Sequence, residues 1–368
     1  MATKKKAETK TKTKKTTKKP VNTAEFKIDA AIKDMNKKVG AGIVQMGVET
    51  VEHEYVRVPF TSPMMNYCTF GGLPVGRLVE FYGPEHGGKT TTAYDIIANY
   101  QNMFPNRNIL FADAENTYDE EWAGTLGVDS SKIIFIHPDG QSAEEILQII
   151  LDMVKNKDLN IGLWVLDSIG ALISKKELDD DLDEAAYAGI SGPLSRFAKS
   201  VQMYMRRNDV LGIAINQERD NIGNPNPYAE PKTPGGRTWK FLCSVRLRFT
   251  QGKYLDEKGN ELSSNAESPV GMKVMMKIKK NKTCKPTRRI GSYTLNFEEG
   301  IDYIKDLVDV AMKYDIITKN GAWFEIVDIF NGDILADKIQ GQPKLFARLE
   351  DDVELLKSVE KLVDKKIQ

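Results

Sequence analysis

The residues from Gly83 to Thr90 read GPEHGGKT and carry the strongest chemical signal in the chain. They satisfy the spacing G-x-x-x-x-G-K-[ST], in which glycines let successive backbone N–H groups turn toward phosphate oxygens. Lys89 supplies a cation, and the Thr90 hydroxyl is a ligand for Mg²⁺. A glycine-rich turn without function is the alternative, but an apolar run precedes the motif and a helical pattern follows it. The residues predicted to bind the nucleotide are Gly83, Pro84, Glu85, His86, Gly87, Gly88, Lys89, Thr90 and Thr91.

Polar side chains follow three later apolar runs, at Glu115, Asp167-Ser168 and Asn216-Gln217. Ligands bind at the carboxyl ends of parallel strands, so these residues are expected at the rim where the glycine-rich loop lies. Asp167 is predicted to hold Mg²⁺ through water as a Walker-B carboxylate, and Glu115 to polarise the attacking water as general base. Gln217 is predicted to sense a γ-phosphate. Each has an alternative role as a helix N-cap or a solvated strand end, but together they favour hydrolysis.

These candidates need a sheet that brings them together, and the chain from residue 78 onward predicts one. Short apolar runs alternate with stretches of helical periodicity, such as 90–104 and 142–156. This alternation predicts an α/β fold, with a mainly parallel sheet flanked by helices on both faces. Beyond residue 243, strands joined by turns predict an antiparallel extension. The predicted strands are 78–82, 109–113, 133–136, 161–167 and 210–216, followed by 244–250, 271–282 and 289–297 in the extension.

Both ends of the chain differ from this central pattern. Residues 24–38 place Phe26, Ile28, Ile32 and Met35 near helical spacing, which predicts a short N-terminal helix. From about residue 300 the pattern predicts a small α+β unit that is rich in helices. The expected domains are 1–22, 23–60, 61–298 and 299–368.

Composition excludes several classes of protein. With 41% hydrophobic and 28% charged residues, the 368-residue chain is neither wholly disordered, collagenous nor embedded in a membrane. Its three cysteines, Cys68, Cys243 and Cys284, are scattered without a C-x-x-C spacing, which argues against a disulfide framework or a zinc site. The sequence contains neither a spanning apolar segment nor a secretory signal pattern, so we expect a cytoplasmic protein.

The net charge of zero results from an uneven distribution of charge along the chain. Residues 1–20 hold nine lysines against one glutamate, a net of +8, so residues 21–368 carry a net of −8. The tail contains almost no apolar residues, and residues 1–22 are therefore predicted to be disordered. Two readings stay open: a solubilising tail, or a flexible arm that captures nucleic acid or an acidic partner.

Over roughly residues 24–350 the sequence resembles the RecA recombinases of bacteria and their phages. The resemblance implies a homo-oligomeric helical filament on single-stranded DNA, which binds ATP with Mg²⁺ between neighbouring subunits. It also implies pairing with homologous double-stranded DNA, strand exchange and DNA-stimulated ATP hydrolysis. The segments that carry the resemblance are GGLPVGRLVEFYGPEHGGKTTTA, FADAENTYDEEWAGTLGVD, VLDSIGAL, AINQERDNIGNPNP, TPGGRTWKFLCSVRLR, KKNKTCKP and GAWF.

The resemblance also implies roles for individual residues. Lys89 and Thr90 would bind phosphate and Mg²⁺, and Asp167 would be the Walker-B aspartate. Glu115 would be the catalytic glutamate, while Gln217 would couple the nucleotide to the adjoining DNA loop. The remaining implied roles are contact with the adenine for Asp119 and Trp122, oligomerisation for residues 23–60, and a C-terminal domain for residues 299–368.

Two lysines near residue 280 are further candidates. Period-two alternation from Val274 to Lys282 would place Lys280 and Lys282 on the same face as Ile278. If that face is buried against another subunit, both cations need an anion, and a neighbour's γ-phosphate would serve. This matches the paired lysines that act in trans in the family. An exposed, lysine-rich strand end is the alternative.

Two segments are predicted to contact DNA. Residues 218–234 lack an apolar period, and a structureless connection of this length is usually functional or disordered. Residues 174–191 carry six acids against two lysines, so their phosphate contacts would come chiefly from the backbone. Guanidinium groups, backbone N–H groups and one aromatic ring would bind the strand. The candidates are Gly189, Ile190, Arg196, Arg219, Tyr228, Gly235, Gly236 and Arg237.

Departures from the bacterial pattern favour a phage or otherwise divergent member. Pro193 stands where the family has an arginine, and the chain ends in KLVDKKIQ without a strongly acidic tail. Because the chain ends without a strongly acidic tail and carries nine lysines in residues 1–20, we expect it to load onto DNA more easily. Two other functions stay open: a nucleotide-gated scaffold that stimulates cleavage of a partner such as a repressor, and a ring helicase. Mediator proteins are further possible partners.

Overall fold

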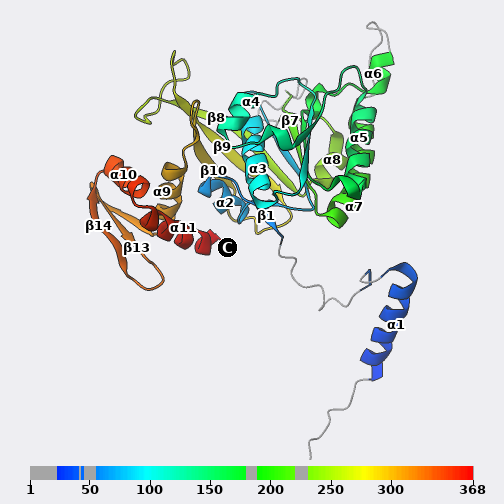
Figure 1. Ribbon diagram of the computed structural model, residues 1–368, viewed down its shortest axis with the longest axis horizontal. Helices are drawn as coiled ribbons and strands as arrows, with labels where there is room; N and C mark the ends of the chain where they lie inside the picture. The colour runs from blue at the N-terminus through cyan, green and yellow to red at the C-terminus, as the bar shows by residue number, and fades with distance from the viewer. Residues whose placement is uncertain (1–22, 41–42, 45–54, 180–188, 220–230, 368) are drawn as a thin grey trace, which may run out of the picture. The chain divides into compact units, whose positions relative to one another are not determined.

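The computed structural model (Figure 1) describes residues 23–40, 43–44, 55–179, 189–219 and 231–367. The chain divides into one unit of residues 1–54 and another of residues 55–368. In the first unit, helix α1 (Thr23–Val39) confirms the helix predicted over 24–38. Its side chains Ile28, Met35 and Val39 are exposed within this unit. The predicted disordered tail, 1–22, lies outside the described residues.

The larger unit is built on a nine-stranded sheet, which confirms the predicted α/β class. All of the predicted strands are present, with boundaries shifted by a few residues at most of the ends. In sheet order the strands are β11 (Gly300–Ile301), β10 (Ile290–Asn296), β9 (Gly271–Asn281), β8 (Val245–Leu255), β3 (Leu78–Gly83), β7 (Leu211–Gln217), β6 (Ile161–Asp167), β4 (Asn108–Asp113) and β5 (Ile133–Ile136).

The relative direction of neighbouring strands in the sheet changes at β8. From β8 across β3, β7, β6 and β4 to β5 every neighbouring pair is parallel. From β8 to β11 every pair is antiparallel, as the predicted extension requires. Strands β3 and β6 are buried along their whole length, because a parallel strand in mid-sheet is covered on both faces. The strand before the glycine-rich loop therefore lies in the middle of the sheet.

Helices cover the two faces of the sheet (Figure 1), and they pack on it through two apolar clusters. One cluster joins Phe81 and Phe111 of the sheet to Ile97 of the helix after the glycine-rich loop. The other joins Trp164 to Ile150 and other apolar side chains of the helices on the opposite face. The helices of this region are α2 (Pro63–Thr69), α3 (Lys89–Met103), α4 (Glu120–Thr125), α5 (Ala143–Lys155), α6 (Lys175–Asp179), α7 (Ser191–Asn208) and α8 (Gly236–Leu242), with 3₁₀ turns η1 (Ser130–Lys132), η2 (Lys157–Leu159) and η3 (Ile169–Ala171).

Helix α5 shows why these residues form helices. Ser142 caps its N-terminus by accepting from the N–H of Glu145, whose carboxylate accepts from the N–H of Ser142. This reciprocal pair satisfies two backbone donors that the first turn would leave free. Ile146, Leu147 and Ile150 then fall on one buried stripe, which packs on the sheet.

The C-terminal part has its own apolar cluster, which includes Val308, Phe324, Leu345 and Val359. Three helices pack there with a three-stranded antiparallel sheet of order β12-β13-β14. No helix within the described ranges is long and apolar enough to cross a bilayer. The remaining elements are β1 (Arg57–Val58), β2 (Leu73–Pro74), α9 (Tyr303–Lys313), β12 (Ile317–Asn320), β13 (Trp323–Val327), β14 (Ile334–Gln340), α10 (Gln342–Asp351) and α11 (Val353–Ile367).

Candidate active site and nucleic-acid interface

The glycine-rich loop connects the end of β3 at Gly83 to the start of α3 at Lys89. Gly83 has φ of +150°, and a Cβ there would lie 1.9 Å from the backbone oxygen of Phe249. Glycine therefore lets the loop pass close against β8. Gly88 is the N-cap residue of α3, and among the described residues no side chain caps this helix. The first N–H groups and the positive end of the helix dipole are thus left for an anion such as phosphate.

Lys89 is held inside the loop. Its side chain is largely buried, and its ammonium donates to the backbone oxygen of Pro84 at 2.5 Å. Burial lowers the pKa of Lys89, and the nearby carboxylates of Asp167 and Glu115 oppose that shift. A partly desolvated cation beside the free N–H groups of α3 is suited to the charge of a triphosphate.

Thr90 and Asp167, the predicted metal ligands, contact each other. The Thr90 hydroxyl donates to Oδ2 of Asp167 at 2.7 Å, and Asp167 is almost fully buried. Burial raises the pKa of Asp167 to about 7 against the hydrogen bond from Thr90, and the carboxylates of Glu115 and Asp113 add to the rise. A nearby cation would favour the ionised form of such a carboxyl. The oxygen donors of this pair fit Mg²⁺, which needs few protein ligands because it keeps several waters.

Glu115 lies where the ends of three strands meet. It follows β4, Ser168 follows β6, and Gln217 ends β7. The Ser168 hydroxyl donates to Oε1 of Glu115, and the Gln217 amide donates to the same oxygen at 3.0 Å. These two donors orient the carboxylate, which is suited to accept a proton from water. The structure thus brings Glu115 and Gln217 into contact, and their roles in hydrolysis stay predictions.

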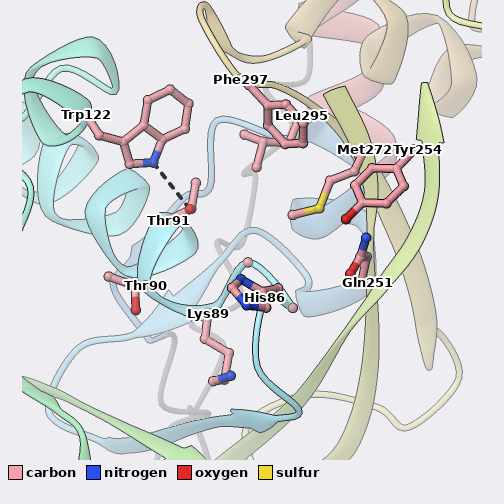
Figure 2. Close-up of a pocket in the computed structure, with 12 residues that line it drawn as sticks. His86, Lys89, Thr90, Thr91, Trp122, Gln251, Tyr254, Met272, Leu295 and Phe297 are labelled. Atoms are coloured by element: carbon pink, nitrogen blue, oxygen red, sulfur yellow. Dashed lines mark hydrogen bonds between the residues drawn. The ribbon is translucent and has the colours of Figure 1, made fainter. Parts of the chain in front are cut away.

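A cavity of about 420 Å³ opens above the loop (Figure 2). The indole of Trp122 lies on one side, where its Nε1 donates to the Thr91 hydroxyl at 3.3 Å. Asp119 caps α4 by accepting from the N–H of Trp122 at 2.9 Å, so it orients the ring-bearing helix. Contact between Asp119 and a base stays a prediction. The other wall is formed by Gln251, Tyr254, Met272, Leu295 and Phe297.

Lys280 and Lys282 are placed by a bulge in β9. Leu247 of β8 pairs with Ile278, but Arg246 pairs with Lys280, so two residues of β9 oppose one of β8. The expectation that Lys280 continues the face of Ile278 was therefore wrong. Ile278 lies in the cluster on the α3 face, whereas Lys280 reaches α8, which packs on the opposite face.

The two ammonium groups bind the C-terminal carbonyls of α8. Lys280 donates to the oxygens of Lys240 and Phe241 at 2.6 and 2.8 Å, and Lys282 donates to the oxygen of Phe241 at 2.8 Å. Burial lowers the pKa of Lys280 to about 8, and the ammonium of Lys282 adds to the effect. The Phe241 ring beside them is 73% exposed. This end of α8 therefore presents two cations and an aromatic ring.

The ends of the two predicted DNA loops lie next to each other. A Cβ on Gly236, the first residue of α8, would meet the Ser191 hydroxyl at 3.3 Å, and Ser191 begins α7. Gly189 is exposed at the end of the first loop, whereas Ile190 is buried. Two helix N-termini, which no side chain of the described residues caps, thus share one corner of the molecule.

The arginine candidates occupy different places. Arg219 is exposed and forms a two-bond β-bridge with Lys232 that closes the second loop at its base. Arg237 is exposed in the first turn of α8. Arg196 is exposed further along α7, where it lines a groove of about 250 Å³ with α5. Tyr228 lies outside the described residues, as do most of the second loop and residues 180–188 of the first.

Several site residues were not found from the sequence. Ser168 was read only as a polar residue after a strand, and its donation to Glu115 depends on the pairing of β4 with β6. The cavity wall from Gln251 to Phe297 comes from three antiparallel strands and their flanks. Alternation in those strands signals which residues share a face. It does not signal that the face borders the glycine-rich loop, because that depends on the order of the strands.

Comparisons with known proteins agree with this geometry. The RecA N-terminal domain family matches residues 26–302 of the chain. The chain is similar to Protein RecA of Thermus thermophilus, with 32% identity over 336 residues, which cover 90% of this chain and 92% of the relative. It is also similar to Protein RecA of Mycoplasmopsis pulmonis, with 33% identity over 301 residues and 81% of each chain. A third relative, Protein RecA of a Sulfurovum species, is 32% identical over 300 residues, 81% of this chain and 82% of its own.

Proposed function

The chain belongs to the RecA family of DNA-dependent ATPases, which act in DNA recombination and repair, and on this premise we propose how it performs that work. It assembles as a filament on single-stranded DNA, with ATP and Mg²⁺ bound between neighbouring protomers. The filament pairs its strand with homologous duplex and exchanges the strands. Hydrolysis then lowers the affinity of the filament for DNA and permits turnover.

The observation that carries this proposal is the contact between Gln217 and Glu115. Gln217 ends β7, and the second predicted DNA loop begins at the next residue. Its amide lies 3.0 Å from the carboxylate that is suited to be the general base. A single side chain therefore touches the hydrolytic site while its backbone continues into the DNA-binding segment. This arrangement supports a hydrolysis rate that responds to DNA.

Each residue of the site has a distinct task in the proposed mechanism. The backbone N–H groups at the start of α3 and the ammonium of Lys89 bind the phosphates. Thr90 and Asp167 would hold Mg²⁺, which would neutralise charge on the phosphate oxygens. Glu115 accepts a proton from the attacking water while Ser168 and Gln217 hold its carboxylate in place. Trp122 stacks on the adenine, and Asp119 orients the helix that carries it.

Filament contacts are proposed for two surfaces. Lys280 and Lys282 project beside the exposed Phe241 ring, and exposed aromatic side chains of this kind are enriched at protein interfaces. In the filament these lysines act in trans on the γ-phosphate held by a neighbour. Helix α1 has exposed Ile28, Met35 and Val39, and we propose that the segment 23–60 serves oligomerisation.

DNA is proposed to bind at the corner that the two loop ends share. The free N–H groups of α7 and α8, with Arg219 and Arg237, contact phosphates, while Tyr228 stacks on bases. Arg196 is retained as a contact further along α7. We also propose that the chain binds homologous duplex DNA, that mediator proteins are further partners, and that it acts in the cytoplasm.

ATP turnover with and without single-stranded DNA tests the proposal directly. Wild type should hydrolyse ATP faster with DNA, and Lys89→Ala should reduce turnover at least about a hundredfold, since it removes a charged phosphate contact. Lys344→Ala removes an exposed lysine of α10 and serves as the matched control. Turnover of wild type that is indifferent to DNA would contradict the proposal.

A second assay distinguishes strand exchange from the two alternative functions, a nucleotide-gated scaffold and a ring helicase. Protein, ATP, a circular single strand and homologous linear duplex are mixed, and the products are resolved on a gel. Joint molecules support strand exchange. Two parallel reactions replace the linear duplex with a repressor-like partner or with a forked duplex. Cleavage of the partner, without joint molecules in the first reaction, indicates a scaffold, and unwinding of the fork indicates a helicase.

A further inference from the structure

A carboxylate lies fully buried in the strand that leads to the glycine-rich loop. Glu80 is 0% exposed in the middle of β3, three residues before Gly83. A buried charge costs several kcal/mol unless it is paired and hydrogen-bonded. Glu80 can therefore stay in the core only because other groups pair with its carboxylate and donate hydrogen bonds to it.

Three different elements donate hydrogen bonds to this carboxylate. Asn216 of β7 donates from Nδ2 to Oε1 at 2.8 Å, and Trp239 of α8 donates from Nε1 to the same oxygen at 3.1 Å. Arg246 of β8 donates from Nε to Oε2 and forms an ion pair with it. Burial disfavours the guanidinium charge, but the Glu80 carboxylate outweighs it and raises the pKa of Arg246. The network joins β3 to two strands and a helix.

The same donors also hold both ends of the second predicted DNA loop. Asn216 accepts from the N–H of Gln217 at 3.0 Å, where the loop begins. Its Nδ2 donates to the Pro234 oxygen at 3.1 Å, where the loop ends. Arg246 reaches the Thr233 hydroxyl at 3.4 Å. The two ends of the segment therefore meet at the partners of one carboxylate.

We propose that Glu80 is a positioning residue that fixes both ends of the second predicted DNA loop, residues 218–234, relative to the nucleotide-binding strand. The inference rests on the proposed function and adds a structural route for its DNA response. It assigns Glu80 no contact with nucleotide or DNA; the residue acts through Asn216, Trp239 and Arg246. If one of these hydrogen bonds is lost, the glycine-rich loop stays in place, but α8 and the end of the second predicted DNA loop shift.

Trp239→Phe is the most informative variant. Phenylalanine keeps most of the buried ring but removes the N–H that binds Glu80, whereas Glu80→Gln would leave Arg246 without its ion pair. Loss of a hydrogen bond to a charged group should lower the ratio of ATP turnover with DNA to turnover without DNA by about tenfold. The KM for ATP should change less than about twofold, because the phosphate contacts are untouched.

The chain offers a matched control in Trp164→Phe. Trp164 is also fully buried, and within the described structure its Nε1 has no hydrogen-bond partner. The substitution deletes the same atoms from the core without breaking a bond. It should leave the turnover ratio as in wild type, and thermal unfolding of both variants will show comparable folded protein.

Hydrogen exchange on the DNA-free and nucleotide-free protein completes the test. The amides of Gly236–Leu242 should exchange faster in Trp239→Phe than in Trp164→Phe or wild type. Equal exchange in the two variants, or equal turnover ratios while wild type remains stimulated by DNA, overturns the inference. A wild type that ignores DNA overturns the proposed function instead, and exchange of the α8 amides still decides whether this network holds the helix.

Discussion

At the scale of single residues, two hydrogen-bond donors orient Glu115, the proposed general base. A glutamate at a strand end has several rotamers of similar energy, and two donors on one oxygen select among them. Gln217 was identified from its position after an apolar strand, but Ser168 acts from a third strand and has no local signature. Its contribution follows only from the folded geometry.

Ser168→Ala tests this contribution. Removal of one of the two donors to Oε1 of Glu115 should lower kcat for ATP about tenfold, which corresponds to roughly 1.4 kcal/mol of activation free energy and is typical of a lost hydrogen bond to a charged group. The KM for ATP should stay within about twofold, because Ser168 does not lie on the cavity wall. Steady-state ATP hydrolysis with saturating single-stranded DNA provides both constants.

Ser168→Thr is the matched control, since it retains the hydroxyl. Its kcat should return to within about threefold of wild type. If the alanine variant kept the kcat of wild type, the hydroxyl would have no role in orienting Glu115.

At the scale of elements, the C-terminal part is joined to the core by a buried carboxyl. Asp306 of α9 accepts from the Ser62 hydroxyl and from the N–H of Met64 at 3.0 Å, at the N-terminus of α2. Burial raises the pKa of Asp306 to about 7, although the hydrogen bonds from Ser62 and Met64 lower it. The stability of the junction between α9 and α2 is therefore expected to depend on pH.

The sign of this dependence follows from the raised pKa. A carboxyl of this kind stabilises the fold in its neutral form below about pH 4, and that contribution is lost as the pH rises through about 7. The variant Asp306→Asn carries an amide that does not titrate, so its unfolding free energy lacks this pH-dependent contribution. Between about pH 5 and about pH 8 wild type should therefore lose roughly 2 kcal/mol of unfolding free energy relative to the variant.

Urea denaturation followed by circular dichroism at several pH values measures this difference. Asp309→Asn, on the same helix, is a control that removes a less buried carboxyl, whose pKa burial raises to a smaller extent. Parallel pH profiles for wild type and Asp306→Asn would show that Asp306 does not control the junction.

The elements also show how far the sequence could predict the fold and the site. Apolar runs and their polar ends predicted the parallel strands and placed Asp167 and Gln217 at one rim, because strand direction follows from chain order. The bulge in β9 could not be predicted, and it moved Lys280 to the other face of the sheet. The partners of Glu80 were also missed, since they depend on which strands are neighbours. Local patterns report periodicity, whereas these contacts depend on register and strand order.

At the scale of the whole molecule, charge is divided between the tail and the rest of the chain. Residues 1–20 carry a net of +8, which balances the net of −8 on residues 21–368. Attraction to phosphates through such a tail depends on counterion release and is weakened by salt. The solubilising tail and the capturing arm therefore differ in a measurable property.

Deletion of residues 2–20 distinguishes these alternatives. If the tail captures DNA, the plot of log affinity against log salt should become less steep, by about 0.7 for each phosphate that the lysines neutralise on a single strand. Fluorescence anisotropy of a labelled oligonucleotide across a salt series measures the slope.

A full-length variant with the nine tail lysines replaced by glutamine is the control for chain length. It should behave as the deletion does, because only charge is lost. A slope identical to that of wild type in both variants leaves the tail with a solubilising role.

The place of β3 in the sheet has a consequence for how two ligands influence each other. Backbone hydrogen bonds tie β3 to β7 on one side and to β8 on the other. One of these neighbours runs into the start of residues 218–234, and the other begins just beyond the helix that follows them. In the proposed function, a movement of β3 along its axis would reach both neighbouring strands across a single strand spacing of about 4.8 Å. This backbone path runs beside the side-chain network of Glu80, so the rigidity of the sheet itself becomes part of the transmitting medium.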